Sequence, residues 1–307
     1  MRLGLAMLLL SALSCGRPAA DPASRLLRQL PAGQAVYLYM DVVRIRSSPP
    51  LDPLVQKRMV FPEGVTEFAN AADLDPLADI DRAAISLGAK GTHLAVEGRF
   101  DEAAVRQAIE NHGAVCSHSL RSEPCTIPAR GSHPELTLSL RAEDLLRVSI
   151  GTHLGEAAQL TETGLQRLVV EARDRLDQGA MLWATFEPGR AEQELQDPPA
   201  GWENLRFFAR ALQKADRGYF YVDELPDGQM QITLKASCAD SSQADSVSKV
   251  LTGLNRLAAA ALEAGKGEDP PPEVRVLRAA RIVNTETTVI AIWVVDGLTL
   301  KAWGGVG

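Results

Sequence analysis

The sequence lacks an excess of basic residues and any long run of lysine or arginine. Of its 307 residues, 39 are acidic and 32 are basic, which gives a net charge of −7. Because nucleic acids and anionic membranes attract basic surfaces, this balance argues against either as the main partner. Hydrophobic residues make up 46% of the chain and charged residues 23%, which is the composition of a folded globular protein.

Familiar catalytic motifs are also absent from the sequence. It contains no phosphate-binding loop, no Gly-x-Ser-x-Gly elbow, no His-Glu-x-x-His helix, no Cys-x-x-Cys pair and no dinucleotide fingerprint. These absences argue against the common enzyme classes. We therefore predict no catalytic residue, no cofactor and no metal site.

The one long apolar run lies at the N-terminus. Arg2 precedes the mostly apolar segment 3–13, which is the order found in a secretory signal peptide. The run is shorter than the ~20 residues that span a bilayer. Small residues precede Cys15, so Ser11 to Cys15 resembles the lipobox of bacterial lipoproteins. That resemblance implies cleavage before Cys15 and attachment of acyl chains such as palmitate; a plain secretory signal is the alternative.

A lipid on Cys15 would hold the chain at a membrane without a transmembrane helix. Residues 1–14 are then the signal peptide, and residues 15–24, which are small, polar and proline-bearing, are a flexible tether. Gly16 follows the cysteine where a retention aspartate could stand. We expect an extracytoplasmic protein anchored to the cell envelope, at the outer membrane facing the periplasm if the bacterium has two membranes.

Two halves, residues 25–178 and 179–307, have the same predicted order of strand, helix, strand, strand, helix and strand. Alternating apolar residues predict the strands, and apolar residues at helical spacing predict the helices. This order is that of split β-α-β, or ferredoxin-like, units. We therefore predict an α+β fold with mostly antiparallel sheets and helices packed on one face. A single sheet shared by both halves is the alternative.

The ranges of the predicted elements follow from these patterns and from the turn residues between them. Strands are predicted at 35–41, 83–88, 93–100, 115–120, 125–127, 136–140, 145–150, 180–187, 218–223, 229–238, 274–283 and 288–296. Helices are predicted at 51–59, 101–111, 163–176, 202–214 and 240–264.

Three short segments resemble an uncharacterised family of bacterial extracytoplasmic proteins built from two ferredoxin-like halves. They are Leu30-Pro-Ala-Gly33 before a strand, Leu74 to Asp81 before the next strand, and Gly98-Arg-Phe-Asp101 before a helix. The family has no established activity or catalytic residue. The resemblance therefore implies a fold and a location and identifies no site.

Cysteine and histidine residues gather in the first half. Cys116 and Cys125 lie nine residues apart across a predicted hairpin, and in an oxidising compartment they are a candidate disulfide. Cys238 is expected to be a buried small hydrophobic residue. One alternative is two unpaired thiols. The other is a metal site formed with the nearby histidines, His112, His118 and His133, although the spacing of these residues matches no familiar zinc module.

Three other groups of residues have both a binding and a structural interpretation, and we favour the structural one for each. The apolar stripe of helix 240–264 could bind a partner, but it is expected to cover its own sheet. The second half has four tryptophans that could form a ligand platform or lie in the core: Trp183, Trp202, Trp293 and Trp303. Four acidic residues could bind calcium or belong to a solvated turn: Asp73, Asp75, Asp79 and Asp81.

We therefore expect a membrane-anchored envelope protein with a non-enzymatic binding or scaffold role and an envelope protein as its partner. A periplasmic ligand carrier is the first alternative, and it would need an apolar cavity lined by residues such as Trp202, Phe207 and Phe208. A hydrolase is the second alternative. It would need His118 or His133 beside an Asp or Ser residue in a cleft.

Replacing Cys15 with alanine should release the protein from the membrane fraction, because the variant has no site for the acyl chains. Metabolic labelling with a fatty-acid probe, followed by fractionation, measures both effects. The Cys238→Ala variant is the control and should keep the label and the membrane attachment. A Cys15→Ala protein that stays membrane-bound and equally labelled would contradict the lipoprotein interpretation.

Overall fold

The computed structural model describes residues 22–56, 74–75, 77–89, 91–129, 135–151, 162–195, 208–264 and 271–305. Cys15, the predicted signal peptide and most of the predicted tether lie outside these residues. Helix α1 (Pro22–Leu27) begins inside the range predicted for the tether, and it buries Ala23 and Leu26. No helix of the described residues is long and apolar enough to cross a membrane.

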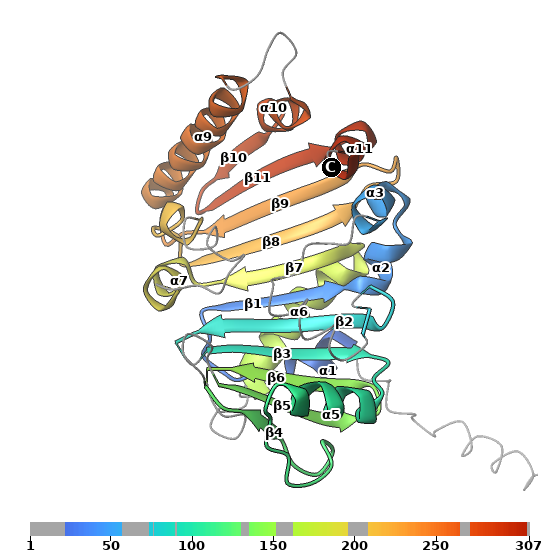
Figure 1. Ribbon diagram of the computed structural model, residues 1–307. Coiled ribbons are helices and arrows are strands. Elements are labelled where there is room, and N and C mark those ends of the chain that lie inside the picture. Colours follow the sequence, from blue (N-terminus) through green and yellow to red (C-terminus); the bar gives the residue numbers. More distant parts are fainter. Residues whose placement is uncertain are drawn as a thin grey trace, which may run out of the picture.

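One antiparallel sheet of eleven strands, built from the described residues, contains both halves of the chain (Figure 1). Its strand order is β10-β11-β9-β8-β7-β1-β2-β3-β6-β5-β4. Strand β1 pairs with β7 on one edge and with β2 on the other. The predicted α+β class and antiparallel pairing are confirmed, and the two halves share a single sheet.

The strands and helices have the following bounds. The strands are β1 (Val36–Asp41), β2 (Ile80–Gly88), β3 (Gly91–Gly98), β4 (Cys125–Ile127), β5 (Leu136–Ala142), β6 (Leu145–Ile150), β7 (Ala180–Phe186), β8 (Arg217–Glu224), β9 (Met230–Ser237), β10 (Arg281–Thr285) and β11 (Thr288–Val295). The helices, after α1, are α2 (Val42–Ser47), η2 (Pro49–Leu51), α3 (Asp52–Gln56), α5 (Glu102–Asn111), α6 (Glu162–Asp177), α7 (Pro188–Glu194), α9 (Ser241–Ala264), α10 (Pro272–Arg278) and α11 (Gly297–Gly305).

The pairing of the strands differs from the predicted split β-α-β order. In a split β-α-β unit, the two strands joined through a helix run parallel and another strand lies between them, whereas here β1 and β2 are direct antiparallel neighbours, as are β7 and β8. The hairpin of β2 and β3, with a connection of two residues, occurs in both arrangements, so the difference lies in where the chain returns after β1 and after β7. The predicted order of elements is therefore compatible with a sheet in which strands that follow one another in the sequence are direct neighbours.

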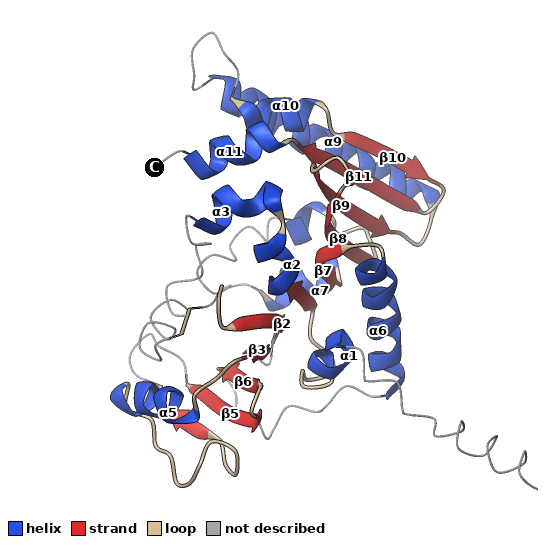
Figure 2. Ribbon diagram, turned by 90° about the vertical axis from the view of Figure 1, so that its right-hand side faces the viewer, coloured by secondary structure: helices blue, strands red, loops and turns tan. Residues whose placement is uncertain are grey.

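Helices cover both faces of the sheet, not one face as predicted (Figure 2). Helices α1 and α6 pack on the face that carries Tyr39 and Trp183, which we call the aromatic face. Helices α5 and α9 pack on the opposite, aliphatic face, which carries Leu146 and Leu234. The cause is visible in β1, where Val36 and Tyr37 are both buried although they point to opposite faces.

The core of the aromatic face combines large and small side chains. Tyr39 pairs with Trp183 on one side and with Ala84 on the other, and Ala84 in turn pairs with Ala95. All four residues are at most 1% exposed. The two alanines leave room for α1, whose Leu26 and Leu27 fill the space beside the aromatic rings.

Two of the predicted strands are wrong. The segment 274–283 forms α10 and then β10, and Pro272 at the first turn of α10 favours a helix start at that point. In the segment 115–120, only Val115 makes a strand-like bridge, to Thr126. In both segments an alternation of apolar and polar residues predicts a strand, but the structure buries Leu120 and Val274 in other conformations and leaves Val115 69% exposed.

A disulfide joins Cys116 and Cys125 beside this bridge, with their Cα atoms 4.6 Å apart. Cys125 lies on β4 and is fully buried in the cluster formed by α5, β5 and β6. Cys238 is unpaired and buried against Leu234 in a second cluster, as expected. The disulfide connects the loop after α5 to the short edge strand β4, which has only three residues of its own for pairing.

Candidate functional site

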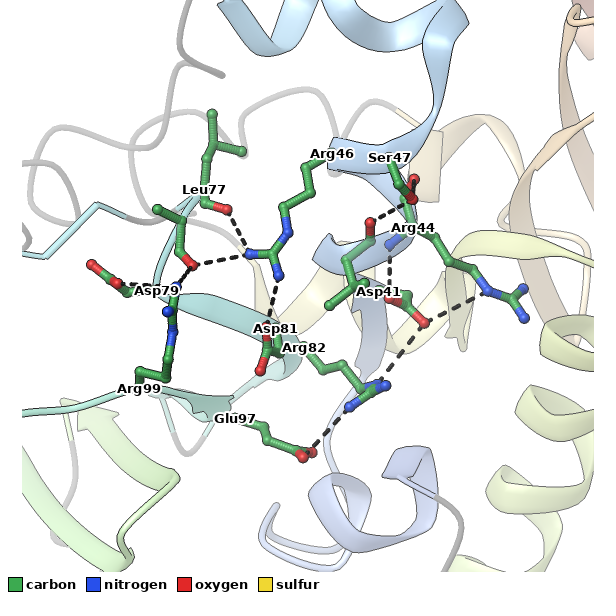
Figure 3. Close-up of polar contacts among 12 residues, drawn as sticks. Asp41, Arg44, Arg46, Ser47, Leu77, Asp79, Asp81, Arg82, Glu97 and Arg99 are labelled. Carbon is green, nitrogen blue, oxygen red and sulfur yellow. Dashed lines mark hydrogen bonds and ion pairs between the residues drawn. The ribbon is translucent and has the colours of Figure 1, made fainter.

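A group of charged side chains in mutual contact lies at the end of β1, where α2 begins (Figure 3). Asp41 is 8% exposed and caps α2, because its carboxylate accepts a hydrogen bond of 3.1 Å from the backbone N–H of Arg44. The same carboxylate lies 3.8 Å from Nε of Arg44 and 3.9 Å from Nε of Arg82. Two guanidinium groups therefore compensate one buried carboxylate.

The charges continue across the sheet in alternating order. Arg82 on β2 lies 3.5 Å from Glu97 on β3, and Glu97 lies 3.7 Å from Arg25 of α1. Arg25 donates a hydrogen bond of 2.5 Å to Asp144, in the turn between β5 and β6. This hydrogen bond lowers the pKa of Asp144 below its ordinary value. We call the series from Asp41 to Asp144 the charge network; it ties α1 to one end of the sheet.

Arg46 and Arg99 hold the acidic segment before β2. Arg46 donates to the carbonyl oxygens of Leu77 and Ala78 at 3.0 Å and to Asp81 at 3.1 Å. Arg99 donates to the carbonyl of Ala78 at 2.6 Å. The segment is thus fixed by arginine donors that bind mainly its backbone, as Figure 3 shows.

The structure gives the acidic residues of this segment structural roles. The Asp75 carboxylate accepts hydrogen bonds from the backbone of Leu77 and Ala78, and Asp79 accepts one from the backbone N–H of Asp75. Asp81 pairs with Arg46. No group of three potential metal ligands occurs among the described residues, and Asp73 lies outside them. The solvated-turn interpretation accounts for these contacts.

A shallow depression of about 430 Å³ adjoins the charge network. Arg44 and Ser47 belong to its wall, and the turn between β8 and β9 forms the other side with Glu224 and Pro226. Ser48 also lines it, and its hydroxyl is buried without a hydrogen-bond partner in the described chain. The depression is lined by the guanidinium of Arg44, the carboxylate of Glu224 and the hydroxyls of Ser47 and Ser48. These groups can bind a polar ligand.

A serine and a histidine meet elsewhere, inside the sheet. Oγ of Ser149 on β6 lies 2.6 Å from Nδ1 of His93 on β3. His93 is 2% exposed and Ser149 is fully buried, so this pair holds the two strands together out of reach of a substrate. Neither residue was predicted as a site residue, although both interrupt the apolar residues of their strands.

A second polar contact lies between α6 and β8 on the aromatic face. The Arg175 guanidinium sits 4.3 Å from the centre of the Tyr221 ring, and burial raises the pKa of Tyr221 to about 12. Burial also raises the pKa of Asp223, which Arg175 opposes. Arg175 thus covers an aromatic ring and offsets a half-buried carboxyl at the edge of α6.

The histidines predicted as alternatives do not converge with Cys116 and Cys125. His112 ends α5, where its Nδ1 lies 2.9 Å from the carbonyl oxygen of Ala108. The exposed His118 has its Nε2 4.0 Å from Glu123, and His133 lies outside the described residues. The two cysteines instead form the disulfide described above.

The aromatic residues proposed as a platform or cavity lining are also separated. Trp183 is fully buried on the aromatic face, whereas Trp293 lies on the aliphatic face and donates a hydrogen bond of 3.0 Å to Asn255 of α9. Phe208 is 45% exposed. Trp202, Phe207 and the side chain of Trp303 lie outside the described residues.

Comparison with known proteins identifies no family for this chain. No family model and no curated protein matches it by sequence. Two solved structures are similar, crystal forms III and IV of the protein TP0453. Form III has a TM-score of 0.47 and 10% identity, covering 94% of this chain and 99% of its own; form IV has 0.45 and 10%, covering 93% and 98%. At these values the likeness supports no functional argument.

Replacing Asp144 with asparagine should destabilise the fold by about 0.2–1 kcal/mol at pH 7, the range for partly exposed ion pairs. Because Arg25 lowers the folded pKa of Asp144, the pair stabilises the fold above about pH 4, and this contribution disappears as the pH falls through the folded pKa. Urea unfolding of both proteins at pH 7 and pH 3 measures the change.

The exposed Asp174 on α6 provides the matched control, and Asp174→Asn should leave the free energy of unfolding unchanged at both pH values. An Asp144→Asn deficit that is as large at pH 3 as at pH 7 would show that the network does not act through the ionised carboxylate.

Proposed function

We propose that this protein is a lipid-anchored, non-enzymatic binding or scaffold protein of the bacterial cell envelope, and that it recruits another envelope protein through α9. The lipid on Cys15 would supply the membrane attachment. Helix α9 would supply the recognition surface. The observation that supports this proposal most directly is an exposed apolar row on a helix whose other side already covers the sheet.

The apolar residues of α9 divide between two directions. Val247 and Leu251 are buried against the sheet, at 1% and 5% exposure. Val250 and Leu257 are 42% and 67% exposed, and seven residues separate them, so they share one side of the helix. We call Val250 and Leu257 the exposed row. Exposed apolar side chains that lie along one side of a folded surface are typical of interaction sites.

Basic residues lie beside the exposed row. Lys249 and Arg256 immediately precede Val250 and Leu257 in the sequence, they have the same seven-residue spacing, and both are exposed. Neither makes an ion pair within the described part of the chain. The surface therefore fits a partner protein that has an apolar groove with an acidic rim.

A photocrosslinking amino acid at Ala261, on the same side of α9, should capture one discrete protein in intact cells. Leu257→Lys should abolish this adduct, because it places a charge in the apolar groove of the partner. Val170→Lys makes the same change at an exposed valine on α6, and it should leave the adduct unchanged. Denaturing electrophoresis and mass spectrometry read the result.

Equal adducts with and without Leu257→Lys would exclude the exposed row as the recognition surface. An adduct that contains lipid alone would contradict the protein partner. Loss of the adduct in both lysine variants would show a general effect of added charge and would also count against the proposal.

A further inference from the structure

Arg147 on β6 is a buried cation without a counter-charge. It is only 8% exposed, and it makes no hydrogen bond or ion pair with the described chain. The charged group that acts on it is Arg141, which repels it. Burial, with a smaller contribution from Arg141, lowers the pKa of Arg147 below its ordinary value, yet a guanidinium keeps its proton at neutral pH.

Three other arginines of the first half have the opposite arrangement. Arg25 pairs with Asp144, Arg82 with Glu97 and Arg46 with Asp81. This protein has seven more acidic than basic residues, so carboxylates are plentiful in its sequence. A buried guanidinium without a counter-charge is energetically costly, and an anion from outside the charge network would compensate it.

Hydroxyl groups lie on one side of Arg147 on the aromatic face, along β5. Ser139 on β5 is its direct cross-strand neighbour, and Ala95 on β3, with no polar group, lies on the other side. Thr137, one step along β5 on the same face, pairs with Ser149. Cross-strand neighbours and the next pair on the same face lie within reach of a long side chain.

Two of these hydroxyls have no partner of their own. Oγ of Ser139 and Oγ1 of Thr137 are buried without a hydrogen bond in the described chain, and both residues are 3% exposed. Ser149 differs, because its hydroxyl is engaged with His93. Three unpartnered donor groups, one of them charged, thus share one face of two neighbouring strands.

We propose that Arg147, Ser139 and Thr137 form a binding site for a small oxyanion, either a phosphate or a carboxylate. A guanidinium presents N–H donors in a planar fork that fits both groups, and each hydroxyl can donate one further hydrogen bond. A water molecule could satisfy the hydroxyls but not the charge. The oxyanion satisfies all three groups together.

This site is separate from the surface proposed on α9. Arg147 lies on the aromatic face of the sheet, in the first half of the chain, whereas α9 packs on the aliphatic face of the second half. The two proposals can therefore fail independently, and the variants that test one do not touch residues of the other.

Thermal unfolding and titration calorimetry of the full chain in a nonionic detergent test the site, with sodium phosphate and sodium acetate as the two probes. Sodium chloride at matched ionic strength gives the baseline. We expect a saturable rise of the unfolding temperature with at least one probe, and the probe that binds more tightly distinguishes phosphate from carboxylate. Native mass spectrometry detects an anion retained through purification.

Arg147→Met should abolish the saturable rise and any retained anion. Without added oxyanion, this variant should unfold at the same or a higher temperature than the wild type, because it removes an uncompensated charge. The combined Ser139→Ala and Thr137→Val variant keeps the charge and should weaken binding about tenfold or more. Arg281→Gln, at an exposed arginine of β10, is the matched control and should bind as the wild type does.

A wild-type chain with no saturable response to either probe and no retained anion would overturn the proposal. So would an equal response from the wild type and Arg147→Met. If Arg147→Met does not fold, the hydroxyl variant decides: unchanged affinity in that variant would exclude the site.

Discussion

Strand β1 hydrogen-bonds on both of its edges, to β7 through one edge and to β2 through the other. Its partner β2 belongs to the first half of the chain and its partner β7 to the second half, so β1 joins the strands of both halves into one sheet. Tyr39 makes the same connection in the core, because it lies between Trp183 of the second half and Ala84 of the first. The positions of α1, α2 and the charge network all follow from that strand.

Charges in this fold fall into two groups with different consequences. At the end of β1, each arginine meets a carboxylate, and the alternation from Asp41 to Arg25 keeps every buried charge compensated. On β6, Arg147 lies beside strand positions that carry hydroxyls and has no carboxylate partner among the described residues. The first group accounts for how the sheet end is held together. The second group is better explained by a ligand, because a structural role would have favoured a pair or an apolar residue.

Much of the fold could be predicted from local patterns. Helix α5 begins at the predicted cap, where Asp101 accepts hydrogen bonds from two backbone N–H groups, and it ends before Gly113 at a φ of 82°. Strands β1 and β11 are strongly apolar, and the sequence predicts both of them. Segment 274–283 was misread because its valines alternate like those of a strand, although Pro272 favours a helix start.

The pairing of strands and the candidate sites could not be predicted in this way. Periodicity shows which face a residue occupies but not which strand lies beside it, so the contact between Asp41 of β1 and Arg82 of β2 could not be predicted. The same limit hid the pair of His93 and Ser149 and the hydroxyls beside Arg147. The apolar residues of β1 occupy both odd and even positions, which predicts burial of both faces of this strand. This pattern therefore favours helices on both faces of the sheet.

Native-state hydrogen exchange of the β1 amides tests most directly whether the two halves form one cooperative sheet. The account predicts that the amides of Leu38, Tyr39 and Met40 exchange only through global unfolding, with the same free energy of opening as the amides of β2 and β7. The contrary result would be β1 amides that exchange at a lower free energy while β3 and β9 remain protected, which would show two halves that fold and open separately.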